Sequence, residues 1–504
     1  MLIWLILVPV IAAALIGLLK TPGKLTAVTS AVITLVLAVA AICCDCSSAN
    51  GDAPTTAGLC QLTLDLPLSK IMLSLTVLVT LAATLGLKAP NKDAERSWSI
   101  SALLLSAGAT GAFLSDSLIS FYAFHELALI PTFVMIGYYG RGDRRTIAWT
   151  ATIYLGLASM VLLAGLLMLC MSLNVWSFTG LRDTMQQLLQ AGALLQNAEG
   201  LLTLMSITGL LLILGFGTLV SLFPFHSWAA PAYASAPTPV AMLHAGVLKK
   251  FGLYGLFTLA WAMGPLCPAY FGDWNNALLI LLLGNILWVG YVTVSRTRLD
   301  DMLGNSSVMH MGYLFLAFAV FIATEGQSEL AFKGAALLML AHGLTIAMLF
   351  LLTGQIESQT RTLELDSMGG LAQKLPKLGF LFGLAGLASI GLPLLANFPG
   401  EFTIFMSCFD GWTPGTGAVE GGLLGTIASW FGGLGPVQLT LIFALWGLVI
   451  SAIYMLRAFR RIFTGEVRLA SERATKLSCT DVLSAGFLAI FIVFFGIVPN
   501  VFFN

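Results

Sequence analysis

Long apolar stretches recur along the whole chain, and only short polar segments separate them. A helix needs roughly 20 apolar residues to cross about 30 Å of hydrocarbon. By this measure the pattern predicts about fourteen membrane-spanning helices, at 2–19, 25–44, 70–87, 98–115, 117–138, 147–172, 200–222, 236–262, 275–295, 305–324, 329–354, 378–405, 435–456 and 481–502. The stretches are too long, and alternate too little, for the strands of a membrane barrel. We therefore expect an all-α integral membrane protein.

Composition supports this fold class. Hydrophobic residues make up 58% of the 504 positions and charged residues only 10%, whereas about a quarter of the residues of soluble domains are charged. With no long polar segment, residues 1–504 are expected to form a single membrane domain. The stretch at 2–19 follows no basic residue and precedes no small-residue cleavage site, so we expect a retained helix and not a signal peptide.

Charge placement predicts the orientation. Most of the 24 lysines and arginines fall in alternate loops, near 20–24, 88–97, 140–146, 296–298, 361–377 and 457–476. Basic loops stay on the cytoplasmic side of a membrane. We therefore expect an even number of helices in the inner (plasma) membrane, with both termini on the outer, periplasmic side.

The cysteines and motifs give little sign of redox chemistry. Cys43, Cys44, Cys46 and Cys60 gather near the predicted outer loop between the second and third helices, where a Cys46–Cys60 disulfide is one possibility. Their spacing matches no standard metal or iron–sulfur site, and no Gly-x-Gly-x-x-Gly fingerprint follows a strand. We expect no metal, cofactor or redox centre in this chain, and nothing points to nucleic acid.

Ionisable residues inside the apolar stretches are the main candidates for chemistry. A charge at the bilayer centre costs at least about 2.5 kcal/mol, so each needs a partner, a water cavity or a function. These stretches contain Glu126, Lys249, Lys250, Lys333 and Glu401, and the five histidines His125, His226, His244, His310 and His342 lie in them or at their ends. Acids, lysines and histidines on different helices at similar depth predict a proton path along the membrane plane.

Some of these residues also have simpler interpretations. Glu126 and Glu401 could be protonated structural acids, whereas Lys250 lies too near the middle of its helix to reach the interface. Lys333 follows Glu329 by one helical turn near a helix end, so a surface ion pair is expected. Lys249 projects about 100° away from Lys250 and could face a neighbouring subunit or a second cavity.

Six segments in colinear order carry a resemblance to a known family. They are Phe-His-Glu-Leu-Ala-Leu-Ile-Pro at 124–131, Phe-Pro-Phe-His-Ser-Trp at 223–228, Ala-Pro-Thr-Pro-Val-Ala-Met-Leu-His-Ala-Gly-Val-Leu-Lys-Lys at 236–250, Ser-Ser-Val-Met-His-Met-Gly at 306–312, Ala-His-Gly-Leu at 341–344 and Asn-Phe-Pro-Gly-Glu-Phe at 397–402. Together they resemble the antiporter-like subunits of respiratory complex I. Among these, bacterial subunit M (chain 4) fits better than subunit L, because no long lateral-helix extension follows the last predicted helix.

The resemblance implies both a fold and roles for residues. Three helices in 1–97 would precede two inverted repeats of about five helices each, at 98–262 and 275–456, with a basic loop and a last helix in 457–504. Each repeat would hold one broken helix, around Pro224 and around Pro393–Pro399. The family's proton-translocating residues map onto Glu126, Lys250, His310, His342 and Glu401; His125, Lys249, His226 and His244 are secondary candidates.

Two positions depart from the family pattern. The family usually has a lysine seven residues before the histidine of the Phe-His-Ser-Trp motif, where it pairs with the channel glutamate, but this chain has Leu219. The motif's second histidine is replaced by Tyr233. We therefore expect Glu126 to lack its usual partner.

The function implied by the resemblance is proton translocation in a complex I-type NADH:quinone oxidoreductase. NADH, FMN, iron–sulfur clusters and quinone would bind to partner subunits, and antiporter-like subunits L and N, other membrane-arm subunits and the lipid bilayer would surround this chain. Alternatives are a subunit of a multi-subunit cation/proton antiporter, the membrane arm of a hydrogenase-linked or inorganic-carbon-uptake complex, and a scaffold subunit inactive in one half.

Overall fold

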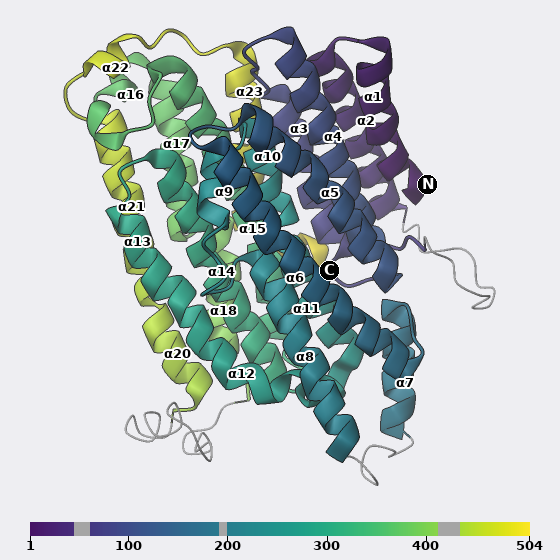
Figure 1. Ribbon diagram of the computed structural model, residues 1–504. Helices are drawn as coiled ribbons and strands as arrows, with labels where there is room; N and C mark the ends of the chain where they lie inside the picture. Colours follow the sequence, from purple (N-terminus) through teal and green to yellow (C-terminus); the bar gives the residue numbers. More distant parts are fainter. Residues whose placement is uncertain (45–60, 191–198, 412–433, 504) are drawn as a thin grey trace.

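The computed structural model describes residues 1–44, 61–190, 199–411 and 434–503, and within these ranges the chain is almost entirely helical (Figure 1). The N-terminal part contains α1 (Leu2–Leu19), α2 (Gly23–Cys43) and α3 (Ser69–Leu85). The next part contains α4 (Lys92–Leu114), α5 (Leu118–Tyr139), α6 (Arg144–Leu173), α7 (Phe178–Gln190), α8 (Glu199–Val220), α9 (Ala229–Ser235), α10 (Thr238–Leu243), a π-helical turn (His244–Leu248) and α11 (Lys250–Met263).

The remaining helices lie between residues 264 and 502. They are a 3₁₀ turn (Gly264–Leu266), α12 (Cys267–Leu283), a π-helical turn (Gly284–Val289), α13 (Gly290–Ser295), α14 (Leu299–Ala323), α15 (Glu329–Thr360), a 3₁₀ turn (Leu365–Ser367), α16 (Leu371–Lys374), α17 (Pro376–Ile390), α18 (Asn397–Ser407), α20 (Pro436–Ala444), α21 (Trp446–Phe463), α22 (Leu469–Glu472), α23 (Cys479–Ile497) and a final 3₁₀ turn (Pro499–Phe502).

The all-helical membrane fold is confirmed. In the described ranges, 11 helical runs are long and apolar enough to cross a bilayer, and α3 and α17 are shorter apolar helices. One of these runs, Thr238–Ser295, turns at Gly264, where φ is 55°, so that α11 and α12 are separate helices (Figure 1). Helices cover every predicted apolar stretch, whereas the number that cross the membrane, the inverted repeats and the four-part division stay predictions.

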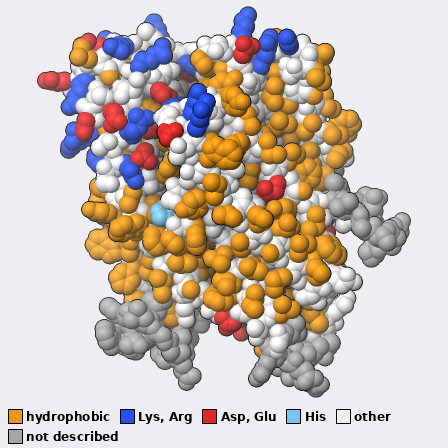
Figure 2. Space-filling view, viewed as in Figure 1, with side chains coloured by type: hydrophobic (Ala, Val, Ile, Leu, Met, Phe, Trp, Pro, Cys, Tyr) orange, Lys and Arg blue, Asp and Glu red, His pale blue; other side chains and the backbone are white. Residues whose placement is uncertain are grey.

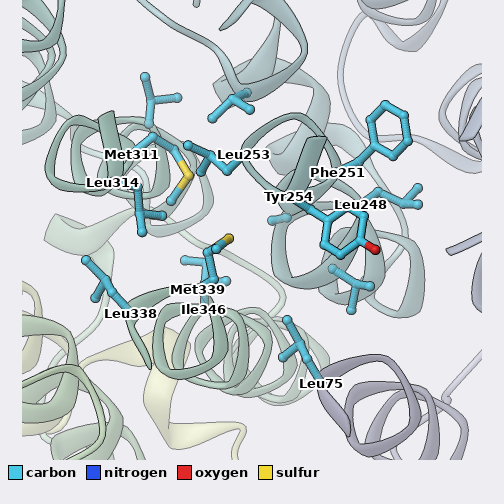
Figure 3. Packing of buried hydrophobic residues seen from close by; sticks show 14 of the residues in the cluster. Leu75, Leu248, Phe251, Leu253, Tyr254, Met311, Leu314, Leu338, Met339 and Ile346 are labelled. Carbon is cyan, nitrogen blue, oxygen red and sulfur yellow. The ribbon is translucent and has the colours of Figure 1, made fainter. Parts of the chain in front are cut away.

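The two helices at the centre of the fold are α14 and α15. All of the most apolar window of α15 is buried and 94% of that of α14, whereas only 33% is buried in α1 and in α2 at the periphery. A helix that is apolar on all sides needs apolar neighbours on all sides, and α15 contacts α3, α10, α14, α17, α18 and α23. Figure 3 shows Leu75, Leu248, Met311, Met339 and Ile346 within this core.

Charged side chains gather at one end of the molecule. Lysines and arginines crowd the upper end in Figure 2, around the loops that join α1 to α2 and α3 to α4 and around α16 and α22 (Figure 1). Hydrophobic side chains cover most of the surface below them. The segregation predicted from alternate loops is therefore visible in three dimensions, and we refer to this end as the basic face.

The first helix break separates α8 from α9 near Pro224, as expected. Ser221 has φ 70° and leaves the helical path. The Asn285 side chain satisfies the released backbone, because its amide donates to the Ser221 carbonyl at 2.9 Å and its oxygen accepts from the Phe223 N–H at 2.7 Å. Buried backbone groups at membrane depth need such partners, so Asn285 makes the break possible.

The second break separates α17 from α18, also as expected. Gly391 ends α17 with φ 84°, a conformation that suits glycine. The carbonyl of Ser389, two residues before Gly391, lies 2.9 Å from His310 Nε2. The Asn397 side chain at the start of α18 accepts a hydrogen bond from Thr345 at 3.2 Å. Side chains from the central helices α14 and α15 therefore support this break.

The longest helix missed by the apolar pattern is α7. The helix α7 is amphipathic and buries only Phe178, Leu181 and Met185. The buried Asp116, in the link between α4 and α5, receives hydrogen bonds from the Thr179 N–H at 3.0 Å and the Thr179 hydroxyl at 2.6 Å. A carboxylate at a helix N-terminus is favourable, but burial raises the pKa of Asp116 more than these hydrogen bonds lower it.

Candidate functional site

Lys250 and His342 are in direct contact at the centre of the molecule. The Lys250 ammonium nitrogen lies 3.0 Å from His342 Nδ1 and donates to the Ala245 carbonyl at 2.8 Å, and both side chains are buried. In the π-helical turn the Lys249 N–H binds the His244 carbonyl at 3.0 Å instead of the Ala245 carbonyl. The turn therefore leaves the Ala245 carbonyl available to Lys250, and such turns are frequent at functional sites.

Two glycines set the distance between these helices. A Cβ on Gly343 would lie 2.7 Å from the Gly246 carbonyl oxygen, and a Cβ on Gly246 would lie 3.0 Å from the Gly343 carbonyl oxygen. Small residues allow membrane helices to approach closely. The pair therefore brings the π-helical turn against α15 and places His342 beside Lys250.

His310 lies next to His342 on the neighbouring helix α14. The two ring centroids are 5.5 Å apart. His310 Nδ1 lies 2.8 Å from the Ser306 carbonyl and Nε2 lies 2.9 Å from the Ser389 carbonyl. Two carbonyl acceptors can both be satisfied only when both ring nitrogens carry hydrogen, so this geometry accommodates a protonated imidazole.

Glu401 occupies the second helix break. The side chain is buried, and its Oε1 has no hydrogen-bond partner among the described residues. Its Oε2 lies against Gly391, where a Cβ would overlap it. Tyr454 is close enough to Glu401 to interact with its charge, and its hydroxyl is 2.7 Å from the Ser306 hydroxyl. Glu401 therefore approaches the His310 region through Tyr454 and Ser306, not through a direct hydrogen bond.

Lys249 is also buried inside this chain. Its ammonium nitrogen donates to the Ser307 hydroxyl at 3.3 Å and lies 5.2 Å from the centre of the Tyr233 ring. The side chain is only 2% exposed. The suggestion that Lys249 faces a neighbouring subunit is wrong, because α14 and α9 enclose it.

Glu126 differs from its expected environment in two ways. Its side chain is 34% exposed, so it is not fully buried. It also has partners: the Ser159 hydroxyl donates to Oε1 at 2.5 Å, and His125 Nδ1 lies 3.4 Å from the same oxygen. Glu126 therefore lacks the family's usual lysine, as expected, but it is not without contacts, because a serine on α6 and the preceding histidine lie against its carboxylate.

The other histidines line two separate cavities. His244 and Glu126 line a cavity of about 190 Å³, here named the Glu126 pocket. His226 lines a larger cavity of about 720 Å³ near the basic face, here named the vestibule, together with Arg141, Arg298 and Asp301. Arg298 donates to Asp300 at 2.9 Å, and this hydrogen bond raises the pKa of Arg298.

The predicted site residues therefore fall into groups. Lys250, His342 and His310 form a contiguous set, here named the lysine–histidine line. Glu126 and His244 line the Glu126 pocket, and His125 lies against Glu126. Glu401 and His226 belong to neither group. Lys333 makes the expected surface ion pair with Glu329 at 2.8 Å, and Cys46 and Cys60 lie outside the described residues.

Sequence reasoning missed several residues of the site. Ser306 and Ser307 lie in the family-like segment 306–312. Only the structure shows that Ser306 contacts Tyr454 and that Ser307 contacts Lys249. Asn285 and Tyr454 had no signal of their own, because a single polar residue in an apolar helix does not reveal its partner. The π-helical turn likewise leaves no periodic pattern.

Interrupted helices that surround a buried lysine–histidine line define a helical membrane protein with a polar centre. Residues 115–426 match the family described as "NADH:quinone oxidoreductase/Mrp antiporter, TM", and the chain belongs to that family. The resemblance to the antiporter-like subunits is thereby confirmed.

Individual relatives agree with this assignment. The "NAD(P)H-quinone oxidoreductase chain 4 2" of Microcystis aeruginosa is 31% identical over 372 residues, which are 72% of this chain and 59% of the relative. The chain thus spans about three fifths of the length of that relative. "NADH-quinone oxidoreductase subunit M" of Rickettsia typhi is 26% identical over 84% of this chain and 77% of its own length.

A solved structure shares the fold. One chain of respiratory complex I from Thermus thermophilus with bound NADH superposes with a TM-score of 0.80 and 23% identity, covering 100% of this chain and 96% of that chain. At this identity the likeness concerns the fold.

Proposed function

We propose that this chain is a proton-translocating membrane subunit of a complex I-type NADH:quinone oxidoreductase. The observation that carries the proposal is the 3.0 Å contact between Lys250 and His342, continued by His310, inside the family-matched region. A buried amine beside an imidazole can exchange a proton without solvent. The names of the relatives support membership of such a complex.

In this proposal the lysine–histidine line carries protons along the membrane plane. Lys250 would hold a proton against the Ala245 carbonyl and release it to His342. The 5.5 Å between the two histidine rings requires a ring rotation or a bridging water molecule for the next step. Glu401, reached through Ser306 and Tyr454, would be the exit-side acid.

Redox chemistry would occur elsewhere in the complex. NADH, FMN, iron–sulfur clusters and quinone would bind to partner subunits, and this chain would hold no redox centre. Antiporter-like subunits such as L and N would be neighbours of this chain. The partly exposed Glu126 supports this part of the proposal, because a carboxylate on an apolar membrane face needs a polar neighbour. The basic face would lie in the cytoplasm and both termini would lie outside the inner membrane.

The test is Lys250→Ala in the intact complex. We expect fewer protons pumped per NADH oxidised, measured with a pH-sensitive dye in sealed vesicles. Lys333→Ala is the matched control, because it removes an exposed lysine from a surface ion pair. Unchanged pumping in the Lys250 variant of an assembled complex would contradict the proposal.

A cation/proton antiporter subunit is the second candidate. The family description includes Mrp antiporters, and Leu219 alters the expected ion-pair chemistry. The subunits that copurify with the chain distinguish the two functions: flavin and iron–sulfur subunits indicate the oxidoreductase. Sodium-dependent proton exchange without electron transfer would indicate the antiporter instead.

A further inference from the structure

The lysine–histidine line does not use Lys249, although Lys249 is as deeply enclosed as Lys250. Among the described residues its only hydrogen bond is the 3.3 Å bond to Ser307, and no carboxylate there lies within 4.0 Å of either lysine. An uncompensated buried ammonium costs several kcal/mol. A leucine or methionine would fill the same space without that cost, so a purely structural role explains Lys249 poorly.

The Tyr233 ring lies between the Glu126 pocket and Lys249. His244 lines the pocket and packs edge-on against the Tyr233 ring at 5.2 Å, and the Lys249 ammonium lies 5.2 Å from the centre of the same ring. His244 Nδ1 is buried and has no hydrogen-bond partner among the described residues. This nitrogen is therefore free to exchange a proton.

The neighbouring broken helix offers no lysine or arginine. Between Arg182 and Lys249 the sequence has no lysine or arginine. Leu219 is 4% exposed and belongs to the apolar core. Along the sequence, Lys249 is consequently the first lysine or arginine after Arg182.

The two lysines are coupled by their proximity. They are adjacent on the chain, and Lys250 is close enough for its charge to act on Lys249. In a low-dielectric interior, a proton on one amine opposes a proton on its neighbour. A proton that arrives at Lys249 would therefore favour release from Lys250 toward His342.

We propose that Lys249 is a second proton-transfer residue, which connects the Glu126–His244 pocket with Lys250. The inference rests on the proposed function, because it assumes that protons pass along the lysine–histidine line. In this proposal Lys249, next to Lys250, supplies a second buried amine, whereas the family usually has its second lysine at the position of Leu219.

The experiment compares three variants in the intact complex. Lys249→Met removes the amine at similar size, Lys249→Arg keeps a cation that does not release its proton, and Lys250→Met interrupts the line itself. Pumping per NADH oxidised is measured in sealed vesicles, and assembly is checked on native gels. Lys333→Met is the matched control.

We expect both Lys249 variants to pump as few protons as Lys250→Met, and a Lys249→Met/Lys250→Met double variant to pump no fewer. Normal pumping by Lys249→Arg would show that the residue supplies only a charge and would overturn the inference. Normal pumping by Lys249→Met alongside a defective Lys250→Met would overturn it and leave the proposed function standing. Normal pumping by all three variants would contradict the proposed function itself.

If Lys249→Met does not assemble, Lys249→Arg and Ser307→Ala decide the matter. Ser307→Ala removes the one hydrogen bond that the described part of the chain gives the Lys249 ammonium. We expect it to lower the pumping rate with assembly unchanged. Normal pumping in both substitutes would overturn the inference.

Discussion

Gly246 and Gly343 face each other so closely that a methyl group on either would press against the carbonyl oxygen of the other. This approach determines how near Lys250 comes to His342. It connects helix packing with proposed proton transfer, because moving the two helices apart would break the 3.0 Å contact without altering either reactive side chain.

Gly343→Ala should therefore lower proton pumping while the complex still assembles. Overpacking of this kind costs about 1–3 kcal/mol, which an assembled complex can tolerate, but a displaced His342 cannot exchange protons directly with Lys250. The measurements are protons pumped per NADH oxidised and the unfolding temperature of the purified complex.

Gly156→Ala is the matched control, because a Cβ at Gly156 meets no atom within 4 Å. We expect it to behave like the unaltered chain. Equal pumping by the Gly343 and Gly156 variants would show that the lysine–histidine contact does not depend on the close approach.

The helices of this chain were predictable because apolar length alone specifies them. The helix α7 escaped because three buried side chains, Phe178, Leu181 and Met185, leave too short an apolar pattern. The break near Pro393 was predictable from proline and glycine, and the break near Pro224 from the family resemblance. The role of Asn285 depends on a contact between segments 62 residues apart.

The site was predictable in composition but not in geometry. Sequence placed Lys250, His310 and His342 at similar depth, and the structure brings them together. It did not reveal that Glu126 is partly exposed, because lipid-facing and protein-facing positions of a membrane helix are both apolar. The partner of a buried polar residue, such as Ser307 for Lys249, depends on which helices pack together.

Arg141 and Glu357 form a two-point ion pair that sequence reasoning also missed. Arg141 Nε and Nη2 lie 2.9 and 2.5 Å from the two carboxylate oxygens, and Nη1 donates to the carbonyls of Ala234 and Ala236 at 3.1 and 2.9 Å. The pair therefore links the end of α5, the segment between α9 and α10, and the end of α15 beside the vestibule.

Arg141→Ala should destabilise the subunit more than Glu357→Ala does, because only the arginine also binds the two carbonyls. A double-mutant cycle should give a coupling energy of about 1 kcal/mol for the partly exposed pair. The measurement is the unfolding temperature of the complex, with the exposed Arg145→Ala as control. Equal losses for the two single variants would show that the carbonyl contacts contribute nothing.

Asp116 makes a prediction about pH. Burial raises the pKa of this carboxyl above its value in the unfolded chain, so the folded state holds the proton more tightly. Protonated Asp116 then contributes fully to the free energy of unfolding below the pKa that it has in the unfolded chain. This contribution is lost as the pH rises through the pKa that it has in the folded chain. Ionisation of the buried Asp116 therefore lowers the stability of the folded state. Asp116→Asn removes this dependence, so its unfolding temperature relative to the unaltered chain should increase from pH 4 to pH 7. Asp93→Asn, at an exposed position, is the control. A decrease in the relative unfolding temperature of Asp116→Asn over that range would show that the hydrogen bonds from Thr179 outweigh burial.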